Sequence, residues 1–477
     1  MASHTSIHQF TAHYHTMLRC SVTSFLLLLL SSTTFSHGLS LATHAPWQPQ
    51  PPAGSNTASC IREERDALLA FKQGITSDPE GDLASWNEDQ EDCCRWRGVR
   101  CSNTTGHVLK LRLRDTHADP YGDPITPLVG QISQSLLALE RLEYLDLSSN
   151  HLEGTTGRIP EFLGSLKNLK YLNLSGIMFS DKVPSQLGNL SNLQYLDLSG
   201  MDGTYSTDVS WLTRLSFLQY LSLDSVELRI KDDWPRVVNM LPSLRVIVLS
   251  NCRLSSATQS LGALNLTNLQ ELDVSYNFFN HPVASCWFWN LTSLTYLDLG
   301  SNYLLYGQLP NALGDMTLLR YLSLSDMKTS VSMIMARLNN LCNLRILYLD
   351  SCFTQGNIVD LIEMLPQCSL NKLQLLSLES NQLTGALPKV MEQLTNLVVL
   401  DLSGNNITGP VPAFIRSMAG LVLLDLSSNK MEGPIPKFIG QFTSLRTLDL
   451  SNNHLNGSVP EEPCGYVPWF AIFVMSN

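Results

Sequence analysis

The segment "LEYLDLSSNHLEG" at residues 142–154 recurs in modified form along most of the chain. Related segments read "LTYLDLGSNYLLYG" at 294–307, "LVLLDLSSNKMEG" at 421–433 and "LRTLDLSNNHLNG" at 445–457. A chain that repeats a short phrase at a fixed period builds stacked units, and their apolar residues form one continuous core. The repeat therefore predicts the fold better than the length of 477 residues does.

Thirteen units of the form LxxLxLxxN follow a first strand predicted at residues 108–116, "VLKLRLRDT". Their spacing of 24 to 29 residues matches the period of leucine-rich repeats. The last position of the units is occupied by Asn150, Ile177, Met201, Val226, Cys252, Asn277, Asn302, Met327, Cys352, Asn381, Asn405, Asn429 and Asn453.

Each unit contains a short strand with one packed and one displayed face. Because alternate residues of a strand point to opposite sides, Leu145 and Leu147 are expected in the core, whereas Tyr144, Asp146 and Ser148 face outward. Stacked strands lie about 4.8 Å apart, so thirteen of them offer a surface on the order of 60 Å long.

The recurrent Asn has a structural explanation, because a buried amide side chain can satisfy the backbone donors and acceptors of a neighbouring coil. Cys252 and Cys352 at this position are expected to act as small buried residues with a weak donor. The apolar residues at the other units of the column cannot supply these hydrogen bonds.

The segments that return from each strand carry Gly and Pro in phrases such as "GRIP", "GALP" and "GPIP". Gly suits a sharp turn, and Pro suits a position with fixed φ and no required donor. Phrases such as "EFLGSLKNL" at 161–169 then predict a short helical turn. Each unit is thus expected to consist of strand, turn and short helix.

Residues 1–36 predict a secretory signal peptide, which starts at Met1 or at Met17. A basic Arg19 precedes the apolar run Phe25 to Leu30, and small residues follow. Residues 37–59, with "PWQPQPPAGS", predict a flexible lead-in. We therefore expect a secreted or cell-surface protein.

Charge and hydropathy restrict the classes of partner. The chain has 31 Lys and Arg against 42 Asp and Glu, and this net charge of −11 argues against a general nucleic-acid binder and favours basic partners. No segment reaches the 18 to 20 apolar residues that a membrane-spanning helix needs, so no span is expected in the chain as given.

Residues 60–107 predict a small N-terminal cap. "EERDALLAFKQGI" places Leu68, Phe71 and Ile75 on one face of a helix, and a cysteine-rich segment follows. Secretion favours two disulfides, for which four cysteines allow three connectivities. A zinc site is disfavoured, because two of the cysteines are adjacent and lack the usual ligand spacing. The cysteines of the cap are Cys60, Cys93, Cys94 and Cys101.

Six later cysteines lie within or after the repeats. Cys342 and Cys368 are about one repeat apart, a spacing that allows a disulfide between adjacent coils, but the sequence leaves the pairing of these six cysteines unresolved. Cys252, Cys286, Cys352 and Cys464 have no partner that the sequence identifies.

Seven sequons for N-glycosylation fit a secreted surface, and the sugars are expected on faces that do not bind a ligand. Their asparagines are Asn103, Asn173, Asn189, Asn265, Asn290, Asn406 and Asn456.

No phosphate loop, HExxH, GxSxG or kinase motif is present, so no enzyme, metal or cofactor is expected. Paired carboxylates can perform acid-base catalysis, and one displayed column repeats Asp in seven units. A residue that recurs at equivalent positions is better explained as part of the repeat, solvated and hydrogen-bonded. We therefore look for function where individual units depart from the pattern.

Such departures gather in the central units and predict a ligand-contact zone from about residue 220 to residue 379. Acidic residues replace the usual Ser or Gly in three units, and Val or Tyr replaces the usual Asp in two units, one of which also carries an acidic replacement. Together with nearby tyrosines they form a mixed aromatic and acidic surface suited to binding, although drift on a solvated sheet explains any single change equally well. The candidates are Tyr220, Asp224, Val248, Tyr321, Tyr348, Asp350 and Glu379.

The cap "DCCRWRGVRC", the "LxYLDLSSN" units and the "GxIP" returns resemble the extracellular region of plant leucine-rich-repeat receptor-like proteins and receptor kinases. The resemblance covers residues 60–460. It implies an α/β solenoid, a right-handed superhelical horseshoe with a parallel β-sheet on the concave face of residues 108–460. It also implies that Cys60 pairs with Cys93 and that Cys94 pairs with Cys101.

Residues 461–477 depart from this family, because "PCGYVPWFAIFVMSN" lacks a C-terminal cysteine cap. A solenoid needs a capping unit at its end, so a truncated product is expected. The alternative is that the tail itself lies over the open end.

The resemblance implies a non-catalytic module that recognises a peptide or protein ligand, most plausibly in plant defence, with signalling through a partner kinase as co-receptor. One alternative is a secreted inhibitor similar to the polygalacturonase inhibitors, suggested by the acidic concave face. A developmental peptide receptor is the other alternative.

Overall fold

The computed structural model describes residues 58–116, 125–230, 233–258, 261–327, 338–457 and 471–473. Most of the predicted signal peptide, lead-in and tail, together with Cys464, lies outside these residues. The chain divides into two compact units, a smaller one of residues 1–162 and 171–178 and a larger one of residues 163–170 and 179–477. This division does not follow the predicted boundary between cap and repeats.

The smaller unit joins the N-terminal cap to the first repeats. Its sheet has the order β2-β3-β5-β7, in which β2 and β3 are antiparallel and the later pairs are parallel. The helix α2 spans Arg62–Gln73 and buries Leu68 and Phe71, but it ends before Ile75, which lies in β1 and not on the predicted helical face. The strands are β2 (Val99–Cys101), β3 (Val108–Arg112), β5 (Tyr144–Asp146) and β7 (Tyr171–Asn173).

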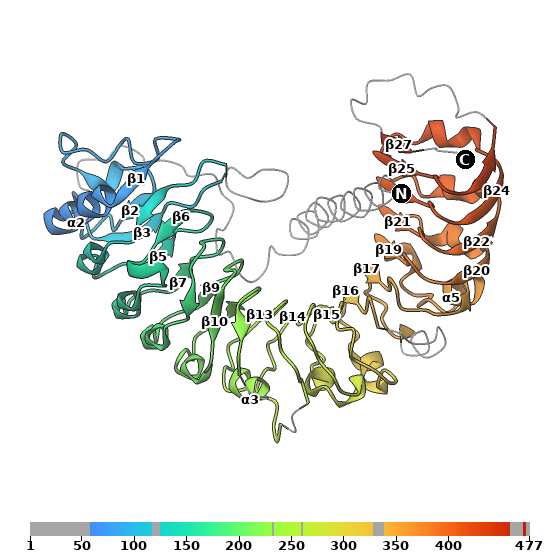
Figure 1. The fold of residues 1–477 in the computed structure, drawn as a ribbon, viewed down its shortest axis with the longest axis horizontal. Helices are drawn as coiled ribbons and strands as arrows, with labels where there is room; N and C mark the ends of the chain where they lie inside the picture. The colour runs from blue at the N-terminus through green and yellow to red at the C-terminus, as the bar shows by residue number, and fades with distance from the viewer. Residues whose placement is uncertain are drawn as a thin grey trace, which may run out of the picture. The chain divides into compact units, whose positions relative to one another are not determined.

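The larger unit is a stack of coils in which every strand pairs in parallel with the next (Figure 1). These strands line the inner side of its curve, and short helices lie on the outer side. In order they are β9 (Tyr195–Asp197), β11 (Tyr220–Ser222), β13 (Val246–Val248), β14 (Glu271–Asp273), β15 (Tyr296–Asp298), β16 (Tyr321–Ser323), β17 (Ile346–Tyr348), β19 (Leu375–Ser377), β21 (Val399–Asp401), β23 (Leu423–Asp425), β25 (Thr447–Asp449) and β27 (Ala471–Phe473).

The strands continue into the tail that the repeat pattern did not predict as regular structure. Thr447 of β25 pairs in parallel with Ala471 of β27, so the tail adds one strand to the sheet of the larger unit. The register is the same as in the preceding pairs, for example Leu423 with Thr447.

Smaller parallel sheets form where the chain leaves the main strands, and we call this side of the sheet the exit edge. In the smaller unit β4 (Val129–Gln131) pairs with β6 (His151–Glu153), and β1 (Ile75–Ser77) joins β4 in antiparallel orientation. In the larger unit the exit-edge strands are β8 (Asp181–Lys182), β10 (Thr204–Ser206) and β12 (Glu227–Leu228), and then β18 (Gly356–Asn357), β20 (Leu383–Ala386), β22 (Asn406–Gly409), β24 (Lys430–Pro434) and β26 (His454–Asn456).

The return segments form short helices, as predicted. The α-helices after α2 are α3 (Trp234–Val238) and α5 (Ile358–Glu363). The 3₁₀ helices are η1 (Cys93–Arg95), η2 (Gln134–Ala138), η3 (Thr155–Gly157), η4 (Glu161–Ser165), η5 (Ser185–Asn189), η6 (Ser210–Arg214), η7 (Val283–Ser285), η8 (Trp287–Asn290), η9 (Asn311–Asp315), η10 (Leu370–Lys372), η11 (Lys389–Gln393), η12 (Ala413–Ser417) and η13 (Lys437–Gln441).

The glycines of the "GxIP" phrases adopt the backbone conformation for which Gly is needed. Gly157, Gly385 and Gly433, for example, have φ of 73°, 97° and 89°. An L-residue with a side chain adopts this region only at a cost in energy, so Gly is the suitable residue at the turn.

The leucines of each unit form the core. Leu145 and Leu147 are completely buried, as are the corresponding leucines of the other units. Burial of a leucine side chain contributes about 1.5–3 kcal/mol, and this gain is repeated in every coil. The predicted α/β solenoid with a parallel sheet on its concave face is thus confirmed.

The recurrent Asn connects consecutive coils, as predicted. The Nδ2 of Asn405 donates hydrogen bonds to the carbonyls of Leu378, Leu402 and Ser403 at 2.8, 3.1 and 3.1 Å, and its Oδ1 accepts one from the Leu383 N–H. The thiols of Cys252 and Cys352 replace it in two units, where they donate to the carbonyls of Leu223 and Leu324 at 3.1 and 3.0 Å. Ile177, Met201, Val226 and Met327 are buried apolar residues in the same column.

Replacing Asn405 by Ala should lower the free energy of unfolding by about 3 kcal/mol, because it leaves several buried backbone groups of two coils without partners. Urea unfolding of the secreted chain measures this difference. The control is Asn311→Ala at an exposed position, where we expect a change below about 0.5 kcal/mol. Equal effects of the two substitutions would show that the amide column does not hold the coils together.

Candidate ligand-binding surface

Stacked tyrosines run along the displayed face of the sheet. In the larger unit the ring centroids of Tyr195 and Tyr220 lie 4.2 Å apart, and those of Tyr296 and Tyr321 lie 3.9 Å apart. Each pair is formed by directly opposed residues of adjacent strands. Such stacks stabilise the sheet by about 0.5–1.5 kcal/mol each. The tyrosines therefore support the scaffold and also present aromatic surface.

The repeated Asp forms a hydrogen-bonded clip at the end of each strand. Oδ1 of Asp401 accepts hydrogen bonds from the backbone N–H and Oγ of Ser403 at 3.0 and 2.7 Å, and Asp273 does the same with Ser275. This geometry agrees with a role in the repeat. The expectation that these residues are solvated holds for part of the column, because Asp273, Asp298 and Asp401 are partly exposed, whereas Asp146 is only 2% exposed.

The first three candidates lie on adjacent strands. Tyr220 is in β11, and Val248 is in β13 directly opposite Ser222. Asp224 follows β11 at the position that usually holds Ser, and it remains partly exposed. Burial raises the pKa of Asp224 to about 6, and the nearby carboxylate of Asp273 raises it further. These three residues thus form one cluster with a weakly acidic carboxyl.

The other four candidates form a second cluster on β16, β17 and β19. The Tyr321 and Tyr348 rings have centroids 5.8 Å apart and a tilt of 49°. Tyr348 occupies the position that holds Asp in most units, directly opposite Ser323 and Ser377. The Tyr321 and Tyr348 rings therefore lie diagonally to each other on two adjacent strands.

Asp350 has a structural role in this second cluster. Its Oδ1 accepts hydrogen bonds from the Ser377 hydroxyl and from the Glu379 backbone N–H, the latter at 2.9 Å. Ser377 stands where most units have the clip Asp, so Asp350 supplies the missing carboxylate from the preceding coil. The departure at Asp350 is thus explained by hydrogen bonding, and only 7% of the residue is exposed. Its role in ligand contact stays a prediction.

Two strands separate the clusters and contribute residues that the sequence analysis did not single out. From β11 to β16 there are four strand steps, or roughly 19 Å. Between them lie Glu271, Tyr296 and Asp298, and the Tyr321 hydroxyl donates to Asp298 Oδ2 at 2.8 Å. Glu271 interrupts the tyrosine column, so a comparison of the repeats at this position could have identified it.

The carboxyl groups in the centre of this face are buried enough to change their acidity. Burial raises the pKa of Glu271 to about 7. Burial also raises the pKa of Asp273 to about 7, with a further contribution from the carboxylate of Asp298. The pKa of Asp298 is likewise raised by burial. This part of the sheet therefore changes its charge near neutral pH.

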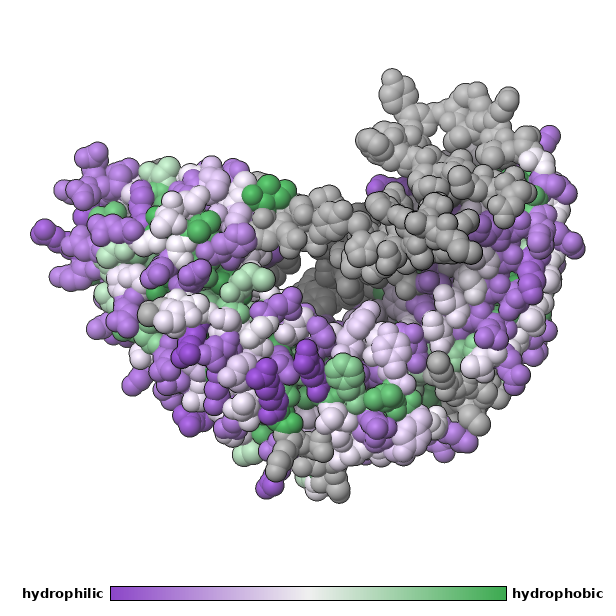
Figure 2. Space-filling model, viewed as in Figure 1, coloured by the Kyte–Doolittle hydropathy of each residue, from purple (hydrophilic) through white to green (hydrophobic). Residues whose placement is uncertain are grey.

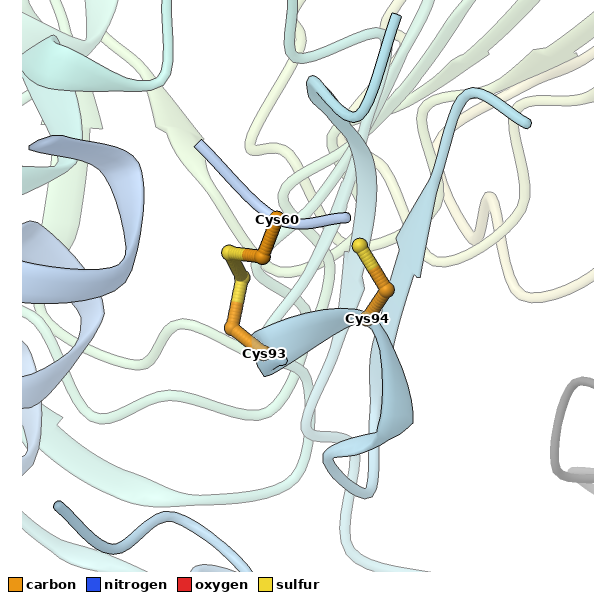
Figure 3. Close-up of side chains that lie close together, drawn as sticks. All are labelled: Cys60, Cys93 and Cys94. Carbon is orange, nitrogen blue, oxygen red and sulfur yellow. A yellow bond between two sulfur atoms is a disulfide. The ribbon is translucent and has the colours of Figure 1, made fainter. Parts of the chain in front are cut away.

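Cysteines form the one group in the described residues that could hold a metal ion. The sulfur atoms of Cys60, Cys93 and Cys94 lie within 4.8 Å of one another (Figure 3). Cys60 is bonded to Cys93, and Cys94 is bonded to Cys101, which matches the pairing implied by the family resemblance. Disulfide sulfurs carry no thiolate, which a zinc site requires. The cluster is therefore structural.

A third disulfide joins Cys342 to Cys368 and links two neighbouring coils, which the sequence had left open. Cys252, Cys286 and Cys352 are buried thiols. Burial raises the pKa of the Cys286 thiol to about 12, which suppresses its reactivity.

The sequons differ in their surroundings. Asn189, Asn265 and Asn290 are exposed, and each lies six residues before the first residue of a main strand. Asn103 and Asn456 are also exposed, and Asn406 is half-buried. Asn173 lies in β7 at the clip position, is only 5% exposed, and accepts a hydrogen bond from the Ser175 N–H at 2.9 Å. A glycan at Asn173 would point from the displayed face.

The buried carboxyl groups predict that the protein is more stable in mild acid. A carboxyl whose pKa is higher in the folded chain than in the unfolded chain binds its proton more tightly when folded. Its stabilising contribution is complete below the unfolded pKa of about 4, and it is lost as pH rises through the folded pKa. For Asp224, Glu271 and Asp273 this window extends to about pH 6–7. We expect a higher Tm at pH 5 than at pH 8.

Differential scanning calorimetry at both pH values measures this effect. Asp273→Asn should reduce the difference in Tm, because it removes one of the titrating groups. An unchanged or lower Tm at pH 5 would contradict the assignment.

Sequon occupancy should follow exposure. Mass spectrometry of the secreted protein after enzymatic deglycosylation should show modification at Asn189, Asn265 and Asn290, because these side chains reach solvent. Asn173 should be unmodified, since the residue is only 5% exposed and its Nδ2, the atom to which a glycan would be attached, lies 3.5 Å from the Tyr171 hydroxyl. Full occupancy of Asn173 in folded protein would show that the smaller unit displays a sugar on its sheet.

Comparison with known families agrees with this architecture. Residues 61–102 match the leucine rich repeat N-terminal domain. Residues 242–304 match one leucine rich repeat model, and residues 141–166, 168–190, 396–418 and 444–466 match another. Among the described residues, no helix has the length and apolar character that crossing a membrane requires.

Plant receptor-like proteins are among the most similar relatives. The chain is 36% identical to Receptor-like protein EIX1 of Solanum lycopersicum over 242 residues, which cover 49% of this chain and 23% of that protein. It is 48% identical to Receptor-like protein EIX2 of the same organism over 126 residues, or 26% of this chain and 12% of that protein. The chain thus spans less than a quarter of the length of either relative.

Solved structures show the same fold. The ectodomain of the receptor kinase GASSHO1/SCHENGEN3 of Arabidopsis thaliana, in complex with CASPARIAN STRIP INTEGRITY FACTOR 2, is 27% identical with a TM-score of 0.59. The match covers 83% of this chain and 48% of that one. A leucine-rich-repeat protein of Leptospira interrogans is 26% identical with a TM-score of 0.52, over 68% of this chain and 82% of that one. The chain is thus a leucine-rich-repeat protein with the repeats and cysteine-bonded cap of the extracellular region of plant leucine-rich-repeat receptor-like proteins.

Proposed function

We propose that this chain is a non-catalytic, extracellular ligand-recognition module of a plant receptor-like protein. Its ligand is a peptide or a protein segment that binds on the concave face of the larger unit. The observation that supports this most directly is the run of aromatic and acidic side chains on the consecutive strands β11 to β19. The proposal also includes a role in defence signalling and a co-receptor kinase as a partner.

The size of this face fits an extended peptide. From β11 to β19 there are six strand steps, or roughly 29 Å. An extended chain advances about 3.4 Å per residue, so about eight residues would cross these strands. Aromatic rings supply contact area with little loss of side-chain entropy, and carboxylates fix orientation by pairing with a cation.

The two candidate clusters would then contact different parts of one ligand. Tyr220, Asp224 and Val248 lie at one end of the face, and Tyr321 and Tyr348 lie nearer the other. Glu271 and Asp298 lie between them and add acidic groups to the path. A ligand with apolar side chains near its ends and a basic residue near its middle would match this order.

The comparisons support a receptor role. GASSHO1/SCHENGEN3 was solved with CASPARIAN STRIP INTEGRITY FACTOR 2 bound, and its ectodomain has the same kind of repeat solenoid. The relatives EIX1 and EIX2 are receptor-like proteins. By analogy, a ligand-binding role for this chain is the simplest proposal, and it depends on fold-level resemblance as well as on the face described above.

Substitution of two displayed residues tests the proposal. A display library of random dodecapeptides, selected on the full chain, supplies the probe peptides. We expect Tyr220→Ala combined with Tyr348→Ala to weaken the binding of the selected peptides by about tenfold or more, because the two rings contact opposite parts of the proposed ligand.

Tyr144→Ala is the matched control, since Tyr144 occupies the same repeat position as Tyr220. Its ring stacks on that of Tyr171, with the centroids 4.0 Å apart, but it lies outside the proposed zone. Unchanged affinity in the double variant would refute the concave-face site. Inhibition of a fungal polygalacturonase by the unmodified chain would favour the inhibitor alternative instead.

A further inference from the structure

A group of exposed apolar side chains lies on the exit edge of two neighbouring coils in the larger unit. Five of the eleven large apolar residues that are exposed in the described part of the chain belong to these two coils, and each is between 49% and 65% exposed. Figure 2 shows hydrophobic surface over this part of the solenoid. We call the group the aromatic edge, and its members are Tyr276, Phe278, Tyr303, Leu304 and Tyr306.

The two coils are in direct contact at this edge. The Tyr276 N–H donates to the Gly300 carbonyl at 2.9 Å, and Pro282 forms a parallel bridge with Tyr306. The five side chains therefore project from two coils that pack directly against each other. Scattered exposed apolar residues need no explanation, but a contiguous group commonly marks an interaction site.

Phe278 and Tyr303 depart from the residues at the equivalent repeat position, directly after the Asn column. Most other units have a polar residue there, so neither the strand nor the turn requires an aromatic ring. The polar equivalents in the described residues are His151, Asp202, Glu227, Arg253, Gln382, Asn406, Lys430 and His454.

Tyr276 also departs from its column and stands at an unfavourable backbone position. Its φ is 54°, in the left-handed region, where the equivalent residues are Ser, Gly, Asn or Asp. A bulky side chain in this conformation costs energy. The Tyr276 hydroxyl forms a hydrogen bond with the Ser301 side chain, but the residue is 60% exposed, so much of the ring is free to contact a partner outside the chain.

The small exit-edge sheet is interrupted at these coils. Within the described residues, its strands run up to β12 and resume at β18, and the bridge between Pro282 and Tyr306 is the remaining pairing. Oδ1 of Asn302 is buried and lacks the hydrogen bond that other column asparagines accept from the exit turn of the preceding coil. The exit-edge sheet is thus irregular where the aromatic residues gather, although the Phe278 N–H still donates to the Leu254 carbonyl at 2.8 Å.

Glycans would leave the aromatic edge accessible. Asn265 and Asn290 are the sequons that lie nearest in sequence to the aromatic edge. Both lie six residues before a main strand, on the side where the chain enters the sheet. The aromatic edge follows the strands, on the side where the chain leaves the sheet.

Carboxylate groups lie near the aromatic edge. Burial raises the pKa of the Tyr276 hydroxyl, and the carboxylates of Asp298 and Asp326 act on it in the same direction. Asp326 is partly exposed and accepts a hydrogen bond from the Ser301 hydroxyl at 2.9 Å. Aromatic faces attract guanidinium and ammonium groups, and nearby carboxylates strengthen this attraction.

We propose that the aromatic edge is a second docking surface, which binds a polypeptide segment carrying Arg or Lys next to an aromatic or aliphatic side chain. The apolar side chain would pack between Phe278 and Tyr303, and the cation would lie over a tyrosine face near Asp326. This surface is separate from the concave face, so the inference goes beyond the proposed function and does not depend on it.

The same random dodecapeptide library, selected on the full chain, tests the inference. A subset of selected peptides should lose about tenfold or more in affinity when Phe278→Ser and Tyr303→Ser are combined, because both anchors are removed. These peptides should be enriched in Arg or Lys beside an apolar residue. Asp326→Asn alone should weaken the same peptides several-fold, and more at low salt than at high salt.

Met178→Ser provides a matched control, since Met178 is an exposed apolar residue at the same repeat position but belongs to the smaller unit. It should leave these affinities unchanged. The substituted positions are exposed, so circular dichroism of the variants should match that of the unmodified chain.

Three outcomes would overturn the inference. The first is that no selected peptide is sensitive to the double substitution, or that the sensitive peptides lack cations. The second is that cellohexaose binds the chain and loses binding in the double variant, which would make the edge a carbohydrate site. The third is a concentration-dependent dimer in sedimentation velocity that the double variant abolishes. Peptides that depend on Tyr220 and Tyr348 but not on the edge would leave the concave-face proposal intact.

Discussion

The hydrogen bonds between a buried side chain of one coil and the backbone of the preceding coil are the interaction on which the rest of the structure depends. Asn405 illustrates it, because a single amide satisfies carbonyls of two coils and an N–H of the exit turn. Leucine burial supplies most of the stabilisation, but it has no direction. The amides fix the register in the units that carry them. Where the column holds an apolar residue, as at Met201 and Val226, the backbone pairs of the main sheet keep the same register, so the displayed side chains fall into columns.

The ordered columns determine what the surface can do. A residue that recurs in a column, such as the clip Asp, is explained by the hydrogen bonds that it makes in each unit. A residue that departs from its column needs a separate reason. For Asp350 the reason lies within the chain, because its carboxylate takes the place of the clip Asp that the next coil lacks. Tyr276 has one such hydrogen bond, between its hydroxyl and the Ser301 side chain, but more than half of Tyr276 and of Phe278 is exposed.

Local pattern was sufficient to predict the main strands of the repeats, the short helices and the core leucines, because each depends on residues at fixed repeat spacing. The pairing of the cap cysteines was implied only by the family resemblance, and the sequence left the pairing of Cys342 and Cys368 open. Burial on the displayed face was harder to predict. Asp146 and Asn173 are nearly inaccessible although they point away from the core, since the clip and the neighbouring strands cover them. Alternation of residues along one strand contains no information about this cover.

The candidate site was predicted less completely for a related reason. Comparison of the repeats identified Tyr220 and Tyr348. It did not show that Asp350 differs from them in having a structural role, because that role depends on a hydrogen bond to Ser377, 27 residues away. It also passed over Glu271, which lies between the two clusters and is buried by its neighbours. The aromatic edge was missed because its members lie after the strands, outside the columns that were compared.

A crystal structure of the full chain with a peptide selected from the display library tests the central claim most directly. The account predicts a peptide in extended conformation across β11 to β19, with side chains against the Tyr220 and Tyr348 rings. A peptide bound to the helical outer side of the larger unit, or to the smaller unit alone, would contradict it.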